Sequence, residues 1–316
     1  MSLNKLVELL MVSSISLVRA LPSAHYSENM MVPRATSAYA DAVSGGGSML
    51  TIVSGTYPAG LGEPLNIIIS GSSDTDVLVD ALTDGGFQNY AQSLNFSTQC
   101  LDSSLTNSTG QQANLGDGQN VQTEIATFRY NYGDTFLGAC KESIVGGNHF
   151  RYWKQANTDA YFLAASVEMN LTLRHDIQPN GYNLGRDWFV GNASSHTVVD
   201  THSLTNGSYF EGTSSSDGYT YRTKVNYVSG LLANSSDSIN HADTVSVNGL
   251  PAIDGLVAVL TVTIDTRPSG SDASPSSSST QSGSLRMTSV PKMLGTLNGL
   301  TAGLIVGIYF GFTFSS

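Results

Sequence analysis

The sequence predicts a single α+β domain with a mixed, mostly antiparallel sheet and a few helices. Apolar runs typical of strands recur between residues 51 and 265. Only two segments of that region, residues 77–82 and 182–190, have the spacing and flanking residues of helices. Both ends of the chain differ from it in composition. We therefore expect one folded domain over residues 51–265, with strands predominating.

The first elements follow a strand, turn and helix order. Residues 49–53 form a candidate short strand, and the β-branched run 65–69 predicts a buried strand that ends in the Ser/Gly turn 70–73. Residues 77–82 have helical spacing, and Gly85 with its neighbouring glycine is expected to stop that helix. Such a turn points backbone N–H groups at anionic groups, so it is also a candidate phosphate or carboxylate site.

The middle of the domain is predicted to be an exposed insertion followed by strands. Residues 95–120 are polar and punctuated by glycine, which is typical of an exposed insertion. Segments 124–130, 150–153 and 159–173 have the apolar patterns of strands. The last of these could equally be helical by spacing, but its aromatic residues and valine favour a strand.

The remainder of the domain begins with the predicted short helix 182–190. Residues 219–228 alternate between apolar and polar side chains, as expected of a strand with one buried face. Residues 255–264 predict a second strand of this kind.

The N-terminus has the pattern of a secretory signal peptide over residues 1–20. Lys5 precedes an apolar run over residues 6–18, which is short for a bilayer span, and Ala20 lies where signal peptidase cuts. An uncleaved anchor or an amphipathic helix is the alternative. Residues 21–50 are polar and small, and we expect them to form a flexible segment.

The C-terminus has the pattern of a glycosylphosphatidylinositol (GPI) attachment signal. Residues 266–284 form a Ser/Pro-rich linker that ends in small residues, with Ser282 and Gly283 as candidate attachment positions. Residues 285–316 then supply a short spacer and an apolar tail. A transmembrane anchor is the alternative, although no Lys or Arg follows Lys292 to act as a cytoplasmic anchor.

Secretion agrees with the N-glycosylation sequons of the chain and suggests an oxidised state for its two cysteines. Six Asn-x-Ser/Thr sequons begin at Asn95, Asn107, Asn170, Asn192, Asn206 and Asn234. In an oxidising compartment Cys100 and Cys140 most simply form one disulfide, worth about 3–4 kcal/mol, and two buried thiols are the alternative. The net charge of -11 argues against nucleic acid as a partner, because phosphate binding needs clustered Lys and Arg.

The candidate chemistry is concentrated in residues 147–190, which contain two His, three Arg, three Asp and both Trp. His149 and Arg151 are two residues apart on a predicted strand, so their side chains share one face while Phe150 and Tyr152 share the other. This arrangement is typical of a strand that carries a functional site, and equally of any half-exposed strand.

Several motifs follow one another along the chain: residues 64–71, a helix ending in Gly-Gly-Phe87, His149-Phe-Arg151-Tyr-Trp153, Arg174-His175-Asp-Ile-Gln-Pro179 and Arg186-Asp187. In this order they resemble the LssY C-terminal domain family, which occurs in bacteria as the tail of membrane proteins with phosphatase-like or DedA-like domains. The resemblance covers residues 61–191 and more loosely 212–231. It implies a fold and a candidate cluster, but no substrate or cofactor.

One interval departs from the family pattern. Gln178, Asn180 and Asn183 lie where more acidic residues are expected between His175 and Arg186. If those acids bind a metal or act as bases in relatives, this chain has lost that activity.

Two functions follow from these observations. The first is a secreted, N-glycosylated, GPI-anchored cell-surface protein with a domain of unassigned activity, such as a ligand-binding module. The alternative is a hydrolase of phosphoesters or lipid head groups, in which Arg151 and Arg186 contact phosphate. His149 or His175 would then be the base or nucleophile, oriented by Asp187.

A metal-assisted variant of the hydrolase would use the two histidines and an aspartate, but no short metal-ligand motif supports it. The Gly-x-Ser-x-Gly, His-Glu-x-x-His and Walker motifs are absent from the sequence, which removes the commonest hydrolase classes. The hydrolase hypothesis requires the side chains of His149, Arg151, His175 and Arg186 to converge at the floor of one concave pocket.

Overall fold

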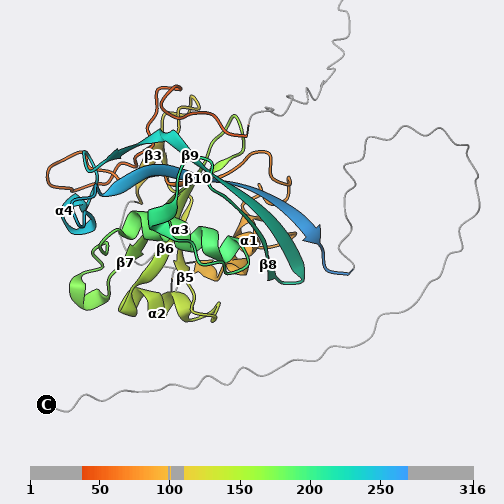
Figure 1. The fold of residues 1–316 in the computed structure, drawn as a ribbon. Helices are drawn as coiled ribbons and strands as arrows, with labels where there is room; N and C mark the ends of the chain where they lie inside the picture. The colour runs from red at the N-terminus through yellow and green to blue at the C-terminus, as the bar shows by residue number, and fades with distance from the viewer. Residues whose placement is uncertain (1–37, 99, 101–109, 270–316) are drawn as a thin grey trace, which may run out of the picture. The chain divides into compact units, whose positions relative to one another are not determined.

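Eight strands pair into one mixed sheet in the computed structural model, which describes residues 38–98, 100 and 110–269 (Figure 1). The strands are β1 Ile67–Ile69, β2 Phe96–Thr98, β5 Ala126–Tyr130, β6 Gly147–Lys154, β7 Tyr161–Glu168, β8 Tyr209–Ser216, β9 Tyr219–Ser235 and β10 Ile253–Thr266. Their order across the sheet is β2-β5-β6-β7-β1-β10-β9-β8. Only β1 and β10 pair in parallel, so the predicted α+β class and mostly antiparallel sheet are confirmed.

Short elements complete the described part of the chain. A second sheet pairs β3 Gln112–Asn114 with β4 Val121–Thr123. The α-helices are α1 Phe87–Ser93, α2 Gly138–Val145, α3 Gly181–Ala193 and α4 Ala242–Val245, and the 3-10 helices include η2 Leu171–Leu173 and η3 Thr201–Ser203. Within the described ranges, no helix is long and apolar enough to cross a bilayer.

The sheet separates two hydrophobic cores because side chains alternate along each strand. On β6, Phe150 and Tyr152 enter the first core, which α1 and α3 cover with residues such as Phe189. Trp153 points to the opposite face and belongs to the second core. Aromatic rings dominate the first core, where Phe128 and Phe150 stack with centroids 5.4 Å apart.

The helix predicted over residues 77–82 is wrong. This segment forms turns, and helix α1 begins at Phe87, immediately after the glycines expected to end a helix. Val77 and Leu78 are buried as their spacing suggested. Polar contacts hold the segment in turns, because Asp74 accepts a hydrogen bond from Ile264 N on β10 and Asp80 accepts one from the Tyr152 hydroxyl on β6.

The N-terminal boundary also lies earlier than predicted. Residues 38–50 pack on the domain, with Ala42 and Met49 buried in the second core, so this part of the segment 21–50 belongs to the fold. The segment lies very close to β3, because a Cβ at Gly47 would lie 2.2 Å from Asn114 O.

The predicted exposed insertion 95–120 is partly wrong as well. It contains β2 and β3, and Phe96 and Leu115 are fully buried. Residues 99 and 101–109, with the sequon at Asn107, lie outside the described residues. Cys100 and Cys140 form the expected disulfide, which joins the end of β2 to α2.

Other boundaries differ where local polar contacts end an element. The predicted strand 159–173 ends at Glu168, because the Asn170 side chain caps η2 by accepting a hydrogen bond from Leu173 N. Helix α2 and strand β8 were not predicted. The expected signal peptide and the whole tail, including Ser282 and Gly283, lie outside the described residues.

Candidate functional site

The five candidate side chains do not form one site. His149 and Arg151 project from the face of β6 that carries Trp153. Arg186 and Asp187 lie on α3, and Asp187 bonds with Tyr227 of the first core. The two groups therefore lie on opposite faces of the sheet, and a single hydrolytic centre built from all five residues is wrong.

His149 lies in a cluster of three carboxylate and histidine side chains, which we call the Glu142–His149–Glu168 cluster. Glu142 comes from α2, His149 from β6 and Glu168 from the end of β7. His149 Nε2 is 3.5 Å from Glu168 Oε1, and His175 Nδ1 is 3.6 Å from Glu168 Oε2. His175 is thus near His149, as the hydrolase hypothesis required, although it lies at the more exposed edge.

Arg129 of β5 holds the two carboxylates of this cluster together. Its Nη1 donates to Glu142 Oε2 at 2.7 Å and to Glu168 Oε2 at 2.9 Å. The register explains the position, because Arg129 pairs directly with His149 across the two strands. A guanidinium bonded to two carboxylates is stable in a half-buried setting.

Burial changes the protonation of this cluster. Burial lowers the pKa of His149 to about 3, although the Glu168 charge opposes the shift. Burial also raises the pKa of Glu142 to about 7, although Arg129 opposes it. His149 is therefore neutral at neutral pH, and its contact with Glu168 is a polar contact between a neutral ring and a carboxylate rather than an ion pair.

Arg151 is engaged by neighbours on the same face. Its Nη1 lies 2.9 Å from Glu124 Oε1, 3.1 Å from Glu124 Oε2 and 2.9 Å from Thr127 Oγ1. The guanidinium thus already has a carboxylate partner where the hydrolase hypothesis required a phosphate.

Arg186 is the centre of a second group, which we call the Arg186 clamp: Arg186, Asp187, Tyr227 and Asp254. The fully buried guanidinium bonds Asp187 through Nε at 2.7 Å and Nη2 at 3.0 Å, and Asp254 through Nη1 at 2.6 Å and Nη2 at 2.8 Å. Nη1 also donates to Leu256 O at 2.8 Å, so all five N–H donors have acceptors. Burial alone would lower the pKa of Arg186, but the two carboxylates raise it above its ordinary value.

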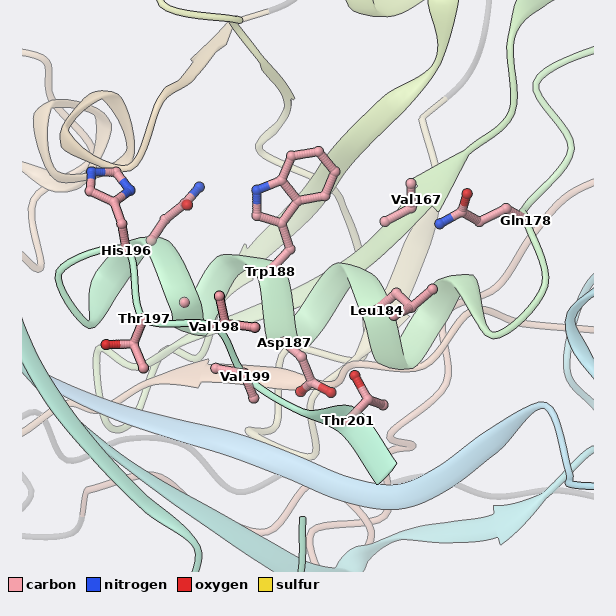
Figure 2. Close-up of a pocket in the computed structure, with 12 residues that line it drawn as sticks. Val167, Gln178, Leu184, Asp187, Trp188, His196, Thr197, Val198, Val199 and Thr201 are labelled. Atoms are coloured by element: carbon pink, nitrogen blue, oxygen red, sulfur yellow. The ribbon is translucent and has the colours of Figure 1, made fainter. Parts of the chain in front are cut away.

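Two pockets flank the Arg186 clamp. The first, of about 340 Å³, lies between α3 and the segment 196–201 that runs alongside it (Figure 2). The second, of about 280 Å³, includes Asp254 in its wall, whereas the first includes Asp187. Thr201 lines both pockets, so they are neighbours along one groove, which we call the α3 groove.

The two ends of the α3 groove differ in chemistry. The first pocket is mainly apolar, with side chains from β7, α3 and the following segment, including Val167, Leu184, Trp188, Val198 and Val199. The second pocket has more polar groups, including Asn180, Asn183, His202, Asn234 and Asp254.

Sequence reasoning missed the partners of the candidate residues. Glu168 follows Ala164 and Ser166 at alternate positions, so alternation along β7 could have placed it on the face of His149. Glu142 belongs to the unpredicted helix α2, and Asp254 lies at the start of β10, 68 residues along the chain from Arg186. No local pattern connects either acid to its partner.

The sequon at Asn192 has no room for a glycan in the folded chain, which corrects the prediction for this position. Asn192 is 7% exposed, and its Nδ2, the atom that would carry the sugar, donates to Leu94 O at 3.0 Å. Asn206 and Asn234 are exposed, and Asn95 and Asn170 are partly exposed. These four positions remain candidates among the described residues.

Comparisons of the chain with protein-family models, with curated proteins and with solved structures found no match. The resemblance to the LssY C-terminal domain family therefore stays a prediction from the motifs around His149, His175 and Arg186.

Proposed function

We propose that this chain is a secreted, N-glycosylated module that is held at the outer cell surface by a lipid anchor and binds a small amphipathic ligand in the α3 groove. The signal-like residues 1–20, the GPI-like tail 285–316 and the accessible sequons support the location. The disulfide between Cys100 and Cys140 is compatible with an oxidising compartment.

The pair of pockets beside the Arg186 clamp is the observation that carries the ligand-binding proposal. Ligand sites are mostly apolar concavities with a few placed polar groups, commonly of about 300–1,000 Å³. The first pocket, at about 340 Å³, lies within this range, and the polar second pocket adjoins it. A ligand with an apolar body and a hydroxyl or amide end matches both parts.

The Arg186 clamp suits a binding floor better than a catalytic centre. The Arg186 guanidinium has no free donor, and it holds the carboxylates of Asp187 and Asp254 in place. A wall fixed in this way is preorganised and loses little entropy when a ligand binds. Arg151 and Arg186 both bind carboxylates of the chain itself, which favours a binding module over a phosphoester hydrolase.

Binding of the neutral fluorophore N-phenyl-1-naphthylamine tests the groove. We expect saturable binding to the purified full chain, with a change in emission from Trp188, which is 36% exposed and lines the first pocket. Leu184→Lys puts a charge in the apolar wall and should weaken binding by about 10-fold or more. Each loss of about 1.4 kcal/mol in binding free energy lowers the affinity tenfold.

The matched control is Leu82→Lys, because Leu82 is a partly exposed leucine at 46% exposure outside the pockets given above. This variant should bind the fluorophore as the unaltered chain does. Equal binding by the two variants, or no saturable binding at all, would contradict the proposal.

Treatment of intact producing cells with phosphatidylinositol-specific phospholipase C tests the anchor. We expect the protein to be released into the medium, because the enzyme cleaves the lipid from a GPI-linked protein. Retention on the cells, together with detection of the intact tail 285–316 by mass spectrometry, would instead favour a transmembrane segment.

A further inference from the structure

The Glu142–His149–Glu168 cluster brings three metal-ligand side chains together on the sheet face opposite the α3 groove. One ligand atom from each residue lies within 4.8 Å of the others. The three side chains come from α2, β6 and β7, so regular secondary structure fixes all of them. Glu142 and His149 are 0% and 2% exposed, and Glu168 is 10% exposed.

Two buried polar atoms of this cluster have no hydrogen-bond partner: Glu142 Oε1 and His149 Nδ1. Buried polar groups in native proteins almost always have a partner, because an unsatisfied donor or acceptor costs about 1–3 kcal/mol. His149 Nε2 is also weakly engaged, because its contacts with Ser166 Oγ and Glu168 Oε1 are both 3.5 Å. The histidine and one glutamate therefore retain free capacity to bind a ligand.

Arg129 occupies only one oxygen of each carboxylate. Its Nη1 bonds the Oε2 atoms of Glu142 and Glu168, so Glu168 Oε1 is left 3.5 Å from His149 Nε2 and Glu142 Oε1 is left without a partner. The group offers two carboxyl groups beside the single positive charge of Arg129, and His149 adds an uncharged nitrogen. This set of groups attracts a cation.

The Glu142 side chain packs closely against the backbone of Gly147. A Cβ at Gly147 would lie 2.9 Å from Glu142 Cγ and 3.7 Å from Glu142 Oε1, and the glycine φ is +154°. Glycine thus lets Glu142 approach the start of β6, where a larger residue would displace its side chain. His175, 28% exposed beside Glu168, marks the direction from which solvent reaches the cluster.

We propose that Glu142, His149 and Glu168 bind one divalent transition-metal ion, with Zn²⁺ or Mn²⁺ as the class that fits. One imidazole and two carboxylates are ligands that these ions accept. Three protein ligands leave a coordination position for water or a ligand on the side of His175. Arg129 stays bound to the Oε2 atoms and weakens the site by its positive charge.

Metal titration of the full chain tests this site. After removal of metal with a chelator, we expect one Zn²⁺ per chain by elemental mass spectrometry. Glu142→Gln and His149→Gln should each weaken the Zn²⁺ affinity by more than ~10- to 100-fold. That range is the loss expected when a residue that only hydrogen-bonds a metal ligand is removed. Glu211→Gln and His241→Gln change the same residue types at exposed positions outside the α3 groove and should leave the affinity unchanged.

The variant Arg129→Gln separates a metal site from a purely structural polar cluster. Removing the guanidinium frees both Oε2 atoms and removes a nearby positive charge, so Zn²⁺ affinity should rise. If the cluster were only structural, this variant would show no gain in metal affinity.

The unaltered protein provides a test that does not depend on folding of the variants. When it is loaded with Co²⁺, the protein should show the intense visible absorption bands of a cobalt ion that has a low coordination number and a bound imidazole. Absence of stoichiometric uptake, a spectrum of hydrated Co²⁺, or uptake that both Glu142→Gln and His149→Gln retain would overturn the proposal. None of these readouts depends on ligand binding in the α3 groove, so the two proposals fail separately.

Discussion

Arg186→Met is expected to destabilise the domain by about 3–5 kcal/mol, the cost of removing one partner from a buried ion pair. Asp187 is 3% exposed and Asp254 also faces the guanidinium, so the substitution leaves two carboxylates without their cation. Methionine keeps an unbranched apolar side chain in place of the aliphatic stem of arginine, so it leaves a smaller cavity than alanine would. The loss therefore reports uncompensated charge rather than a large cavity.

Chemical denaturation of the full chain, followed by fluorescence and circular dichroism, measures this effect. The matched control is Arg222→Met, because Arg222 bonds Asp265 at 2.6 Å while 43% of its side chain is exposed. Solvent screens that pair, so the control should lose far less stability. Tyr227→Phe removes only the hydroxyl that donates to Asp187 at 2.8 Å and should fall between the two. Equal losses in both arginine variants would show that the Arg186 clamp does not stabilise the fold.

Replacing both cysteines, as Cys100→Ser with Cys140→Ser, is expected to lower the free energy of unfolding by about 4 kcal/mol. The sequence separation of 40 sets this value, because a cross-link reduces the entropy of the unfolded chain according to the length of the loop it closes. The double substitution avoids leaving a reactive single thiol. It also leaves β2 and α2 without their covalent link.

Denaturation midpoints of the double variant and the oxidised chain under identical conditions give the difference. A second comparison uses the unaltered chain after reduction and alkylation, which should lose a similar amount of stability. If neither treatment moves the midpoint, loop closure does not contribute to the stability of this domain.

The strands were the most predictable part of the fold. Alternation along residues 219–228 predicted the first part of β9, because every second side chain there enters a core. The length of β9 to Ser235 was not predictable, because pairing with β10 extends it past Gly230 and through an irregularity in the register, over residues that do not alternate. Local spacing likewise misplaced the first helix, because contacts of Asp74 and Asp80 with distant strands hold that segment in turns.

The candidate site was predictable only in part, for a geometric reason. Strand alternation correctly placed His149 and Arg151 on one face of β6. The sequence could not show that α3 covers the other face, so it grouped Arg186 with His149 although the sheet lies between them. Which face a helix covers depends on the whole topology, and the order of motifs along the chain carries no such information.

The position of β1 has a consequence for biosynthesis. Ile67 pairs with Leu163 on one side and Ala258 on the other, so the centre of the sheet joins segments about two hundred residues apart. During synthesis, β1 cannot pair with its second neighbour until nearly the whole domain has been made, and contacts of such long range form slowly. Until then one edge of β1, with its three isoleucines, is unpaired, and molecular chaperones are the natural protection for such an edge.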